Sequence, residues 1–176
     1  MSISNIPDPG FAGDDGSADA DLAAALSAYA ATPDADHRDV LVVLQRARLL
    51  VPVVAMLGDA EYDERGLAHD KTSDMATVLT RGRDGRMALL AFTNTDSLAA
   101  WNPDARPVPA PAARVAAAGL QDKAEAIVID LAGPVMFVVE AADLRALADG
   151  QMLHRVDGSY AWFKHLTSAG PSDIGP

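Results

Sequence analysis

The sequence predicts an α+β domain in which a mixed sheet of about five strands, built on two β-hairpins, is covered by helices. The first observation is that Asp84-Gly85, a strong two-residue turn signal, stands between two apolar runs. The second is that two further apolar runs flank Ala132-Gly133. The third is that apolar residues recur with helical spacing before and between the hairpins.

The chain of 176 residues divides into three parts. Residues 1–17 are rich in Gly, Pro, Asp and Ser, carry no Lys or Arg, and predict a flexible acidic leader. Residues 18–150 form the predicted α/β domain, which is long enough to bury a core. Residues 151–176 change composition and form a C-terminal extension that contains aromatic residues.

Two helices open the domain. The first covers residues 18–31, where Leu22, Leu26 and Tyr29 share one stripe. The second runs from about residue 34 to 46, after Pro33. His37 lies one turn before the apolar stripe of this helix, and we interpret it as a capping or partly buried histidine rather than as a ligand.

Leu49–Met56 is a continuous apolar run with several valines, which predicts a strand buried on both faces. Pro52 cannot donate to a β-ladder, so we expect an edge strand or a bulge at that point. The polar segment Gly58–Lys71 follows, and its carboxylates and His69 form either a neutral loop or a cation or acid–base site.

The first hairpin joins Met75–Thr80 to Met87–Phe92. A two-residue loop at Asp84-Gly85 would pair Thr80 with Leu89 and place Arg83 opposite Arg86. Both faces of this hairpin are apolar, so we expect helices or a second subunit to cover the sheet on two sides. The arginines at the tip form either an anion-binding site or a solvated hairpin end.

After this hairpin, Thr95 or Asp96 is expected to cap a short helix that ends at Trp101, before Asn102-Pro103. Leu98 and Trp101 share a face and can dock this helix on the sheet. The proline-rich segment that follows is expected to be extended up to Pro111, which suits the first turn of a helix running to about Leu120.

The second hairpin joins Ala126–Leu131 to Pro134–Glu140. A turn at Ala132-Gly133 would place Ile127, Ile129, Met136 and Val138 on one face, and Val128, Phe137 and Val139 on the other. Asp130 either satisfies the backbone of the turn or is an isolated functional carboxylate. Ala141–Ala148 is a short helix that ends near Gly150.

The extension holds three aromatic residues in four positions, Tyr160, Trp162 and Phe163 around Ala161. Aromatic side chains of this size dominate the energetics of protein interfaces. Two interpretations stay open: the segment folds back over its own domain, or it docks on another subunit or a partner.

The composition excludes several classes of function. A net charge of −11 disfavours nucleic acid and anionic membrane surfaces as partners. The absence of cysteine removes thiolate chemistry, and the four histidines show no spacing typical of metal ligands, so we expect no metal site. Nothing in the sequence brings candidate general acids and bases together, and we expect no cofactor and no catalytic residues. No apolar run approaches the ~18–20 residues of a membrane span, and no signal peptide is visible, so we expect a cytoplasmic protein.

Four segments carry a family resemblance, in this order: LLVPVVAML, KTSDMATVLT, DGRMALLAFTNTDSLAAWNPDARPVP and AIVIDLAGPVMFVVE. Over about residues 38–150 the chain resembles the SseB N-terminal domain as it occurs in actinobacterial proteins. The resemblance implies a compact mixed α/β unit, a name linked to serine sensitivity and secretion, and no known reaction. The positions that match the family motif, and so form a candidate surface, are Lys71, Ser73, Asp74, Trp101 and Arg106.

The sequence therefore supports two hypotheses. In the first, the chain is a non-enzymatic interaction domain that binds a protein partner or a second copy of itself, through the aromatic extension or an uncovered sheet face. In the second, a small-molecule pocket lies between the segment 61–74 and the segment 101–106, where Lys71 or Arg106 would bind an anionic group.

Overall fold

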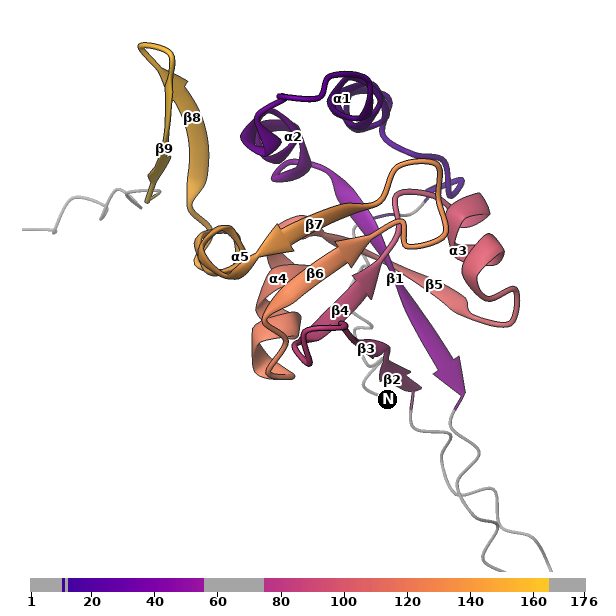
Figure 1. Cartoon of the computed structure of the whole chain (residues 1–176). Coiled ribbons are helices and arrows are strands. Elements are labelled where there is room, and N and C mark those ends of the chain that lie inside the picture. The colour runs from indigo at the N-terminus through magenta and orange to yellow at the C-terminus, as the bar shows by residue number, and fades with distance from the viewer. Residues whose placement is uncertain (1–10, 12, 56–74, 165–176) are drawn as a thin grey trace, which may run out of the picture.

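The computed structural model describes residues 11, 13–55 and 75–164, and it confirms the α+β class (Figure 1). The sequence predicts one sheet of about five strands; instead the described strands form sheets of three, four and two strands. In chain order the elements are α1 (Ala20–Ala31), α2 (His37–Leu44), β1 (Arg48–Ala55), β2 (Met75–Thr77), β3 (Leu79–Arg81), β4 (Met87–Ala91), α3 (Thr95–Trp101), β5 (Arg106–Pro111), α4 (Ala112–Gln121), β6 (Ala126–Ile129), β7 (Phe137–Glu140), α5 (Ala141–Ala148), β8 (Met152–Val156) and β9 (Ser159–Phe163).

The three-stranded sheet has the order β2-β1-β5 and is antiparallel throughout. The four-stranded sheet has the order β3-β4-β6-β7, and its central pair, β4 and β6, is parallel. An isolated bridge between Leu50 and Phe92 joins the two sheets. Figure 1 shows α1 and α2 above the β7 edge of the four-stranded sheet, and the hairpin β8–β9 projecting from the domain at the left.

Two apolar clusters lie on opposite faces of β4. Leu89 and Ala91 belong to the larger cluster, together with buried residues of α1, α2, α4 and α5. Leu90 and Phe92 belong to the smaller cluster, which includes Leu98 of α3. The prediction that the first hairpin is covered on both sides is therefore confirmed for β4. Its physical basis is the apolar character of consecutive residues, which a sheet with one wet face would not show.

The predicted register of the first hairpin is wrong by one residue. Leu79, not Thr80, pairs with Leu89. The Gly82 amide donates to the Arg86 carbonyl at 2.8 Å, so the loop holds three residues, Arg83 to Gly85, instead of two. Gly85 has φ +84°, as the last position of such a loop requires. Arg83 therefore lies inside the loop and does not pair with Arg86.

The second hairpin departs from the prediction in the same way. Ile127 pairs with Val139 and Ile129 with Phe137, so these four residues share the face that lines the larger cluster. The expected grouping of Ile127 with Met136 and Val138 is wrong. The predicted turn has two residues, an even number, whereas the connection between β6 and β7 runs from residue 130 to 136, an odd number. Because side chains alternate between the faces of a strand, this difference moves the side chains of β7 to the opposite face.

The position of Pro52 corrects another expectation, since β1 is the central strand of its sheet. Leu50 exchanges two backbone hydrogen bonds with Phe92, both 2.8 Å long. Backbone groups alternate in direction along an antiparallel strand, so the nitrogen of Pro52 points to the same side of β1 as that of Leu50. It lies in the gap between the bridge to Phe92 and the pairs with β2, which begin at Val53. A proline is tolerated there because no ladder bond is required of it. The register with β5 is continuous, so that ladder has no bulge.

The same alternation explains the proline-rich strand β5. Leu49, Val51 and Val53 direct their backbone groups to β5, where their partners are Ala110, Val108 and Arg106. The prolines at 107, 109 and 111 therefore turn their nitrogens away from β1, to the outer edge. Prolines placed in this way prevent a further strand from pairing with the edge.

Helix α3 begins at Thr95, but its cap is Asn94 and neither Thr95 nor Asp96. The Asn94 side-chain oxygen accepts from the Ser97 amide at 2.7 Å. This is the usual pairing of a cap with the third helical residue, and it requires the cap to stand outside the helix. The predicted end of the helix at Trp101 is confirmed.

Candidate functional site

The outer edge of β7 is open, and the hydrogen bonds of the sheet fix which of its residues face outward. Leu90 donates to Val78, so the even-numbered residues of β4 face β3 and the odd-numbered ones face β6. Asp130 donates to Ala91, so the even-numbered residues of β6 face β4, and Ile127 and Ile129 face β7.

Phe137 and Val139, the partners of these two isoleucines, therefore use their backbone groups in the ladder. The backbone groups of Val138 point the other way, as do those of its neighbours at 136 and 140. Within the described part of the chain, no residue hydrogen-bonds to the amide or carbonyl of Val138 outside the sheet. This edge can accept another strand.

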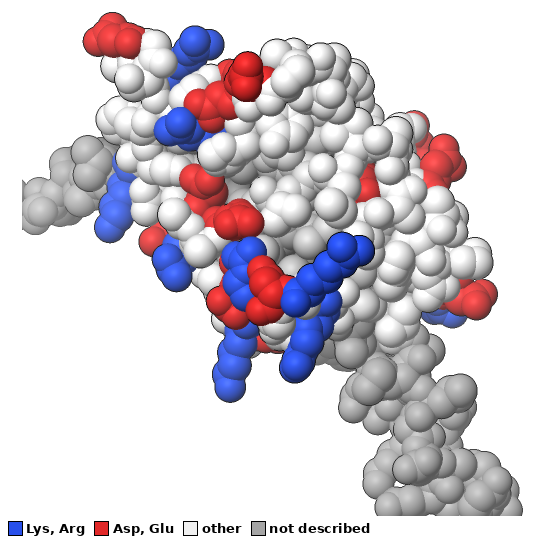
Figure 2. All heavy atoms as spheres, in the orientation of Figure 1, with Lys and Arg blue, Asp and Glu red and all other residues white. Residues whose placement is uncertain are grey.

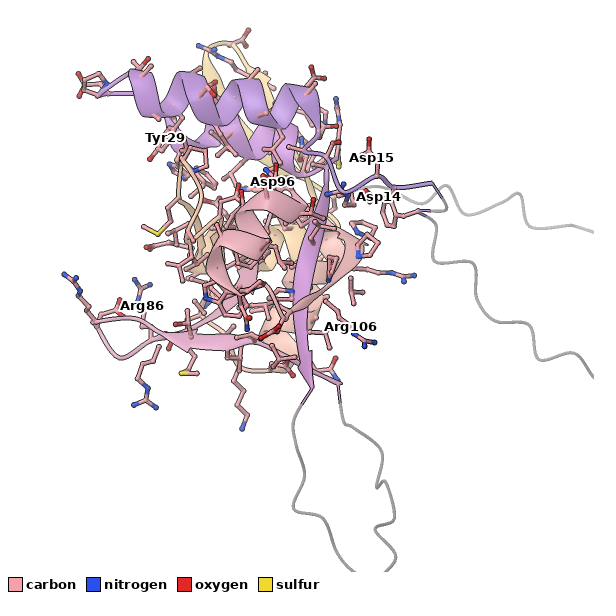
Figure 3. All side chains as sticks on the ribbon, turned by 90° about the vertical axis from the view of Figure 1, so that its right-hand side faces the viewer. Asp14, Asp15, Tyr29, Arg86, Asp96 and Arg106 are labelled. Atoms are coloured by element: carbon pink, nitrogen blue, oxygen red, sulfur yellow. The ribbon has the colours of Figure 1, made fainter. Side chains whose placement is uncertain are left out.

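A groove of about 370 Å³ runs along this edge. Tyr29, in the last turn of α1, forms one wall, and its ring meets the Phe137 ring edge-on at 5.5 Å. Figure 3 shows Tyr29 below α1, on the side of the sheet. The lining residues are Tyr29, His37, Met136, Phe137, Val138, Glu140 and Asp143. They come from α1, α2, the end of the β6–β7 connection, β7 and α5, so the groove forms only when these segments fold together.

The apolar part of the groove is accessible. Met136 is 53% exposed, while Val138 is half-buried. Both side chains lie on the face opposite Phe137, and neither belongs to the two apolar clusters. Among the described residues, the smaller cluster on this face therefore reaches Val128 of β6 but includes no residue of β7.

Carboxylates gather at the end of the groove where β7 passes into α5. Asp143 Oδ2 lies 3.1 Å from His37 Nε2, and its other oxygen accepts from Trp162 Nε1 at 3.0 Å. His37 Nδ1 lies 3.6 Å from Asp36. The histidine expected to be a cap or partly buried is thus a surface residue between two carboxylates, and the cap of α2 is Asp36.

Glu140 is the second carboxylate at this end and has a weak partner. Arg86 Nη2 lies 3.4 Å from Glu140, whereas Arg86 Nε lies 2.5 Å from Asp84. The hydrogen bond from Arg86 lowers the pKa of Asp84, and the pKa of Arg86 is raised by Asp84 first and by Glu140 second. Since Asp84 is the primary partner of this arginine, the negative charge of Glu140 is only partly matched. Figure 3 shows Arg86 at the end of the first hairpin.

The aromatic extension forms a third hairpin, β8–β9, about Asp157-Gly158, where φ is +49° and +80°. Asp-Gly with two positive φ values is the favoured two-residue hairpin turn. Leu153 is buried in the larger cluster. The Gln45 side chain holds its backbone by donating to its carbonyl at 3.0 Å and accepting from its amide at 2.6 Å. The hairpin is therefore anchored at its base to α2.

Of the three aromatic residues, two turn toward the domain. Trp162 donates to Asp143, and Tyr160 donates to Asp39, which raises the pKa of the tyrosine. Arg38 and Arg155 lie 5.3 and 5.6 Å from the centre of the Tyr160 ring. These contacts agree with the interpretation that the aromatic segment folds back over its own domain. Phe163 is 48% exposed and touches the ring of His154 on the outer face of the hairpin.

The described part of the leader is held against the domain by Arg48. This guanidinium donates to Ser17 and Thr93 carbonyls at 2.7 and 2.8 Å, and its Nε lies 2.5 Å from Asp14. The Thr95 amide donates to the Gly16 carbonyl at 2.9 Å. Asp14 and Asp15 are labelled in Figure 3, where they lie on the irregular segment that leads into α1. Within the described residues, no group of three potential ligands could hold a metal ion.

The Asp130 carboxylate satisfies a backbone amide, but that of Thr93, between β4 and α3, and not one of its own turn. It is 3% exposed, and its carboxylate accepts from the Thr93 amide at 2.9 Å and from the Thr93 hydroxyl at 2.6 Å. The Asn94 amide completes the network by donating to the same hydroxyl at 3.0 Å. Asp130 thus connects the end of β6 to the start of α3, and its position marks it as a structural residue.

The residues matched to the family motif are only partly described. Lys71, Ser73 and Asp74 lie outside the described residues, as does the polar segment 58–71, so the pocket expected between residues 61–74 and 101–106 is not described. Trp101 packs against Phe92, with ring centres 5.6 Å apart, and Arg106 is exposed at the start of β5.

Sequence reasoning missed the groove, because its residues have no common spacing. One feature of the sequence does point to this edge, and it is the absence of proline from the strand. The strand at 106–111 carries alternate prolines, whereas the strand at 137–140 has none, so only the latter keeps its outward amides.

The fold and the groove define a small α+β domain in which no described strand pairs with the outer edge of β7. Among protein families, the SseB protein N-terminal domain matches residues 22–146. The match covers more than half of the chain, which therefore belongs to this family, and the resemblance found from the sequence is confirmed. No curated protein and no solved structure matches the chain. None of the helices in the described residues is long and apolar enough to cross a bilayer.

Proposed function

We propose that this SseB domain is a non-enzymatic, cytoplasmic protein-interaction domain in which an extended segment of a partner adds to β7 as the next strand. The observation that carries the proposal is the outward amide and carbonyl of Val138, which face a groove of about 370 Å³. Strand addition of this kind gains its affinity from main-chain hydrogen bonds and its selectivity from alternate side chains.

The outer edges of β5 and β3 are protected against pairing, which supports the choice of β7 as the binding edge. Every second residue of β5 is a proline, and these are the residues whose nitrogens face the outer edge. The edge strand β3 has three residues and ends in the exposed Arg81, which is a common way to discourage pairing. Proteins generally protect the edges that they do not use, so an edge that lacks this protection and borders a groove is a candidate for use.

The groove does not favour the other classes of function. Its acid–base pair, His37 and Asp143, is not enclosed, since the histidine side chain is 47% exposed. Two carboxylates line the groove, so an anionic small molecule would be repelled there. A partner segment needs neither a catalytic group nor a cationic pocket.

Substitution of Val138 by proline tests the proposal. Proline removes the outward amide but takes nothing from the ladder with β6, so the domain should fold. Val138→Thr is the matched control, because it keeps the amide and a β-branched side chain. With the purified full chain as bait, partners should be recovered by the wild type and by Val138→Thr and lost by Val138→Pro. Recovery of the same partners by Val138→Pro would refute strand addition at β7.

Light scattering separates a second copy from another protein. If the domain pairs with itself through β7, a dimeric mass will fall to that of the monomer in Val138→Pro. A dimer that survives this change but is lost when the chain is truncated at Gly150 would instead place the contact on the aromatic hairpin, where Phe163 and Val156 are about half exposed.

A further inference from the structure

We infer that the segment added to β7 belongs to another protein and carries a Lys or Arg at the end of the groove where β7 meets α5. This inference rests on the proposed function, and it adds the chemistry of the partner and the position of its charged residue.

The position follows from the geometry of strand addition. A new strand lies about 4.8 Å from β7, and side chains of directly opposed residues have Cβ atoms about 4.5–5.5 Å apart. Glu140 is the last residue of β7 and its amide faces the outer edge, so a residue opposite it is within reach of its carboxylate. Asp143 lies one turn further on, in α5, and lines the same end of the groove.

The charges around this end do not balance. Arg86 is the only cation described as paired with Glu140, and Asp84 binds it more closely, at 2.5 Å against 3.4 Å. His37 lies between Asp143 and Asp36, and Arg38 pairs with Asp36 at 2.9 Å. The groove is thus lined by two carboxylates and one histidine, and a cation on the added strand would improve this balance.

The apolar end of the groove sets the rest of the sequence preference. Tyr29, Met136 and Val138 line it, and Met136 is 53% exposed. An added strand that places an apolar residue beside Met136 would bury this surface. The expected segment is therefore apolar at one end and basic at the other.

A second copy of the chain fits this chemistry poorly. If it paired through its own β7 edge, it would present the same two carboxylates. Each copy also carries a net charge of −11, which opposes association of like molecules. Figure 2 shows acidic and basic side chains interleaved on one side of this face, beside a broad area without charged residues.

A displayed library of random twelve-residue peptides tests the inference directly. The full wild-type chain is used for selection and Val138→Pro for counter-selection. We expect the recovered peptides to be enriched in Lys and Arg, depleted in Asp and Glu, and unable to bind Val138→Pro. A recovered peptide synthesised with Lys or Arg replaced by Gln should bind more weakly.

The reciprocal change is Glu140→Gln. It should weaken binding of a basic peptide by about two- to fivefold, the range expected for one exposed ion pair, and make binding less dependent on salt. Glu125→Gln is the matched control, since it removes the same charge from an exposed residue at the start of β6 and should leave binding unchanged.

The outcomes separate the two claims. Peptides that depend on Val138 but show no preference for Lys or Arg would overturn the inference and leave strand addition in place. Peptides that bind Val138→Pro as well as the wild type, or a library that yields no binder, would overturn both. A wild-type dimer that is lost in Val138→Pro would also overturn the inference, because the occupant would then be a second copy.

Discussion

Removal of the Asp130 carboxylate should destabilise the domain more than any other single carboxylate change among the described residues. In Asp130→Ala the Thr93 amide loses its acceptor. Thr93 is only 3% exposed, so water cannot replace the carboxylate. An unsatisfied buried amide costs about 1–3 kcal/mol, and the charge-assisted bond to the hydroxyl adds about 1.5–3 kcal/mol. Asp130 has φ +52°, where alanine is strained by about 1 kcal/mol. We expect a total loss of about 3–5 kcal/mol, because such terms are not fully additive.

Asp130→Asn distinguishes this explanation from a general effect of charge. Asparagine keeps an oxygen for the Thr93 amide and tolerates positive φ, so it should lose only about 1–2 kcal/mol. Urea unfolding followed by circular dichroism measures both variants, with Asp104→Ala as an exposed control that should change stability by less than about 0.5 kcal/mol. If Asp130→Ala lies within about 1 kcal/mol of the wild type, or if Asn is as costly as Ala, the carboxylate does not connect β6 to α3 as described.

Three other predictions test separate parts of the structure. Val139→Pro should be at least ~2 kcal/mol less stable than Val138→Pro in urea unfolding, since only residue 139 donates to β6, and equal stabilities would contradict the assigned edge. Gln45→Ala should release the β8–β9 hairpin, because an isolated two-stranded hairpin is only marginally stable. Trp162 fluorescence should then shift to the red while global unfolding stays cooperative. An unchanged spectrum would mean that Gln45 is not the anchor. Because Asp39 raises the pKa of Tyr160, the folded state holds this proton more tightly than the unfolded chain, and the associated stabilisation is present below pH ~10 and is lost as pH rises through the folded pKa. Ultraviolet titration should detect a high-pKa tyrosine that returns toward its ordinary value in Asp39→Asn, and identical titrations would contradict the contact.

The sequence predicted the elements better than their pairing. Helices at 20–31 and 112–121 agree with the structure and both turns form, because apolar spacing and turn residues are local signals. The run predicted as one strand, Met75–Thr80, is divided: β2 pairs with β1 in the three-stranded sheet, and only β3 pairs with β4. The register of each hairpin was wrong, because it depends on one residue of loop length. Asp84-Gly85 occurs in two-residue and in longer loops alike, and only the bond from Gly82 to Arg86 shows which one forms.

The groove could not be predicted from the sequence for a different reason. Tyr29, His37 and Asp143 lie on three helices, and only the order β3-β4-β6-β7 brings them to one edge. The same order decides that Val138 faces outward and Val139 inward, although both are valines in one apolar run. The C-terminal hairpin was missed as well, although Asp157-Gly158 is the same turn signal that identified the first hairpin.

Amide hydrogen exchange at Val138 and Val139 in the full wild-type chain tests the open edge most directly. Val139 should be protected to the level of the other strands, whereas Val138 should exchange at least ~100-fold faster, because its amide has no partner within the described fold. On addition of a peptide recovered by selection, Val138 should become protected and Val139 should not change. Equal protection of the two amides in the free chain, or no gain at Val138 on binding, would contradict the account.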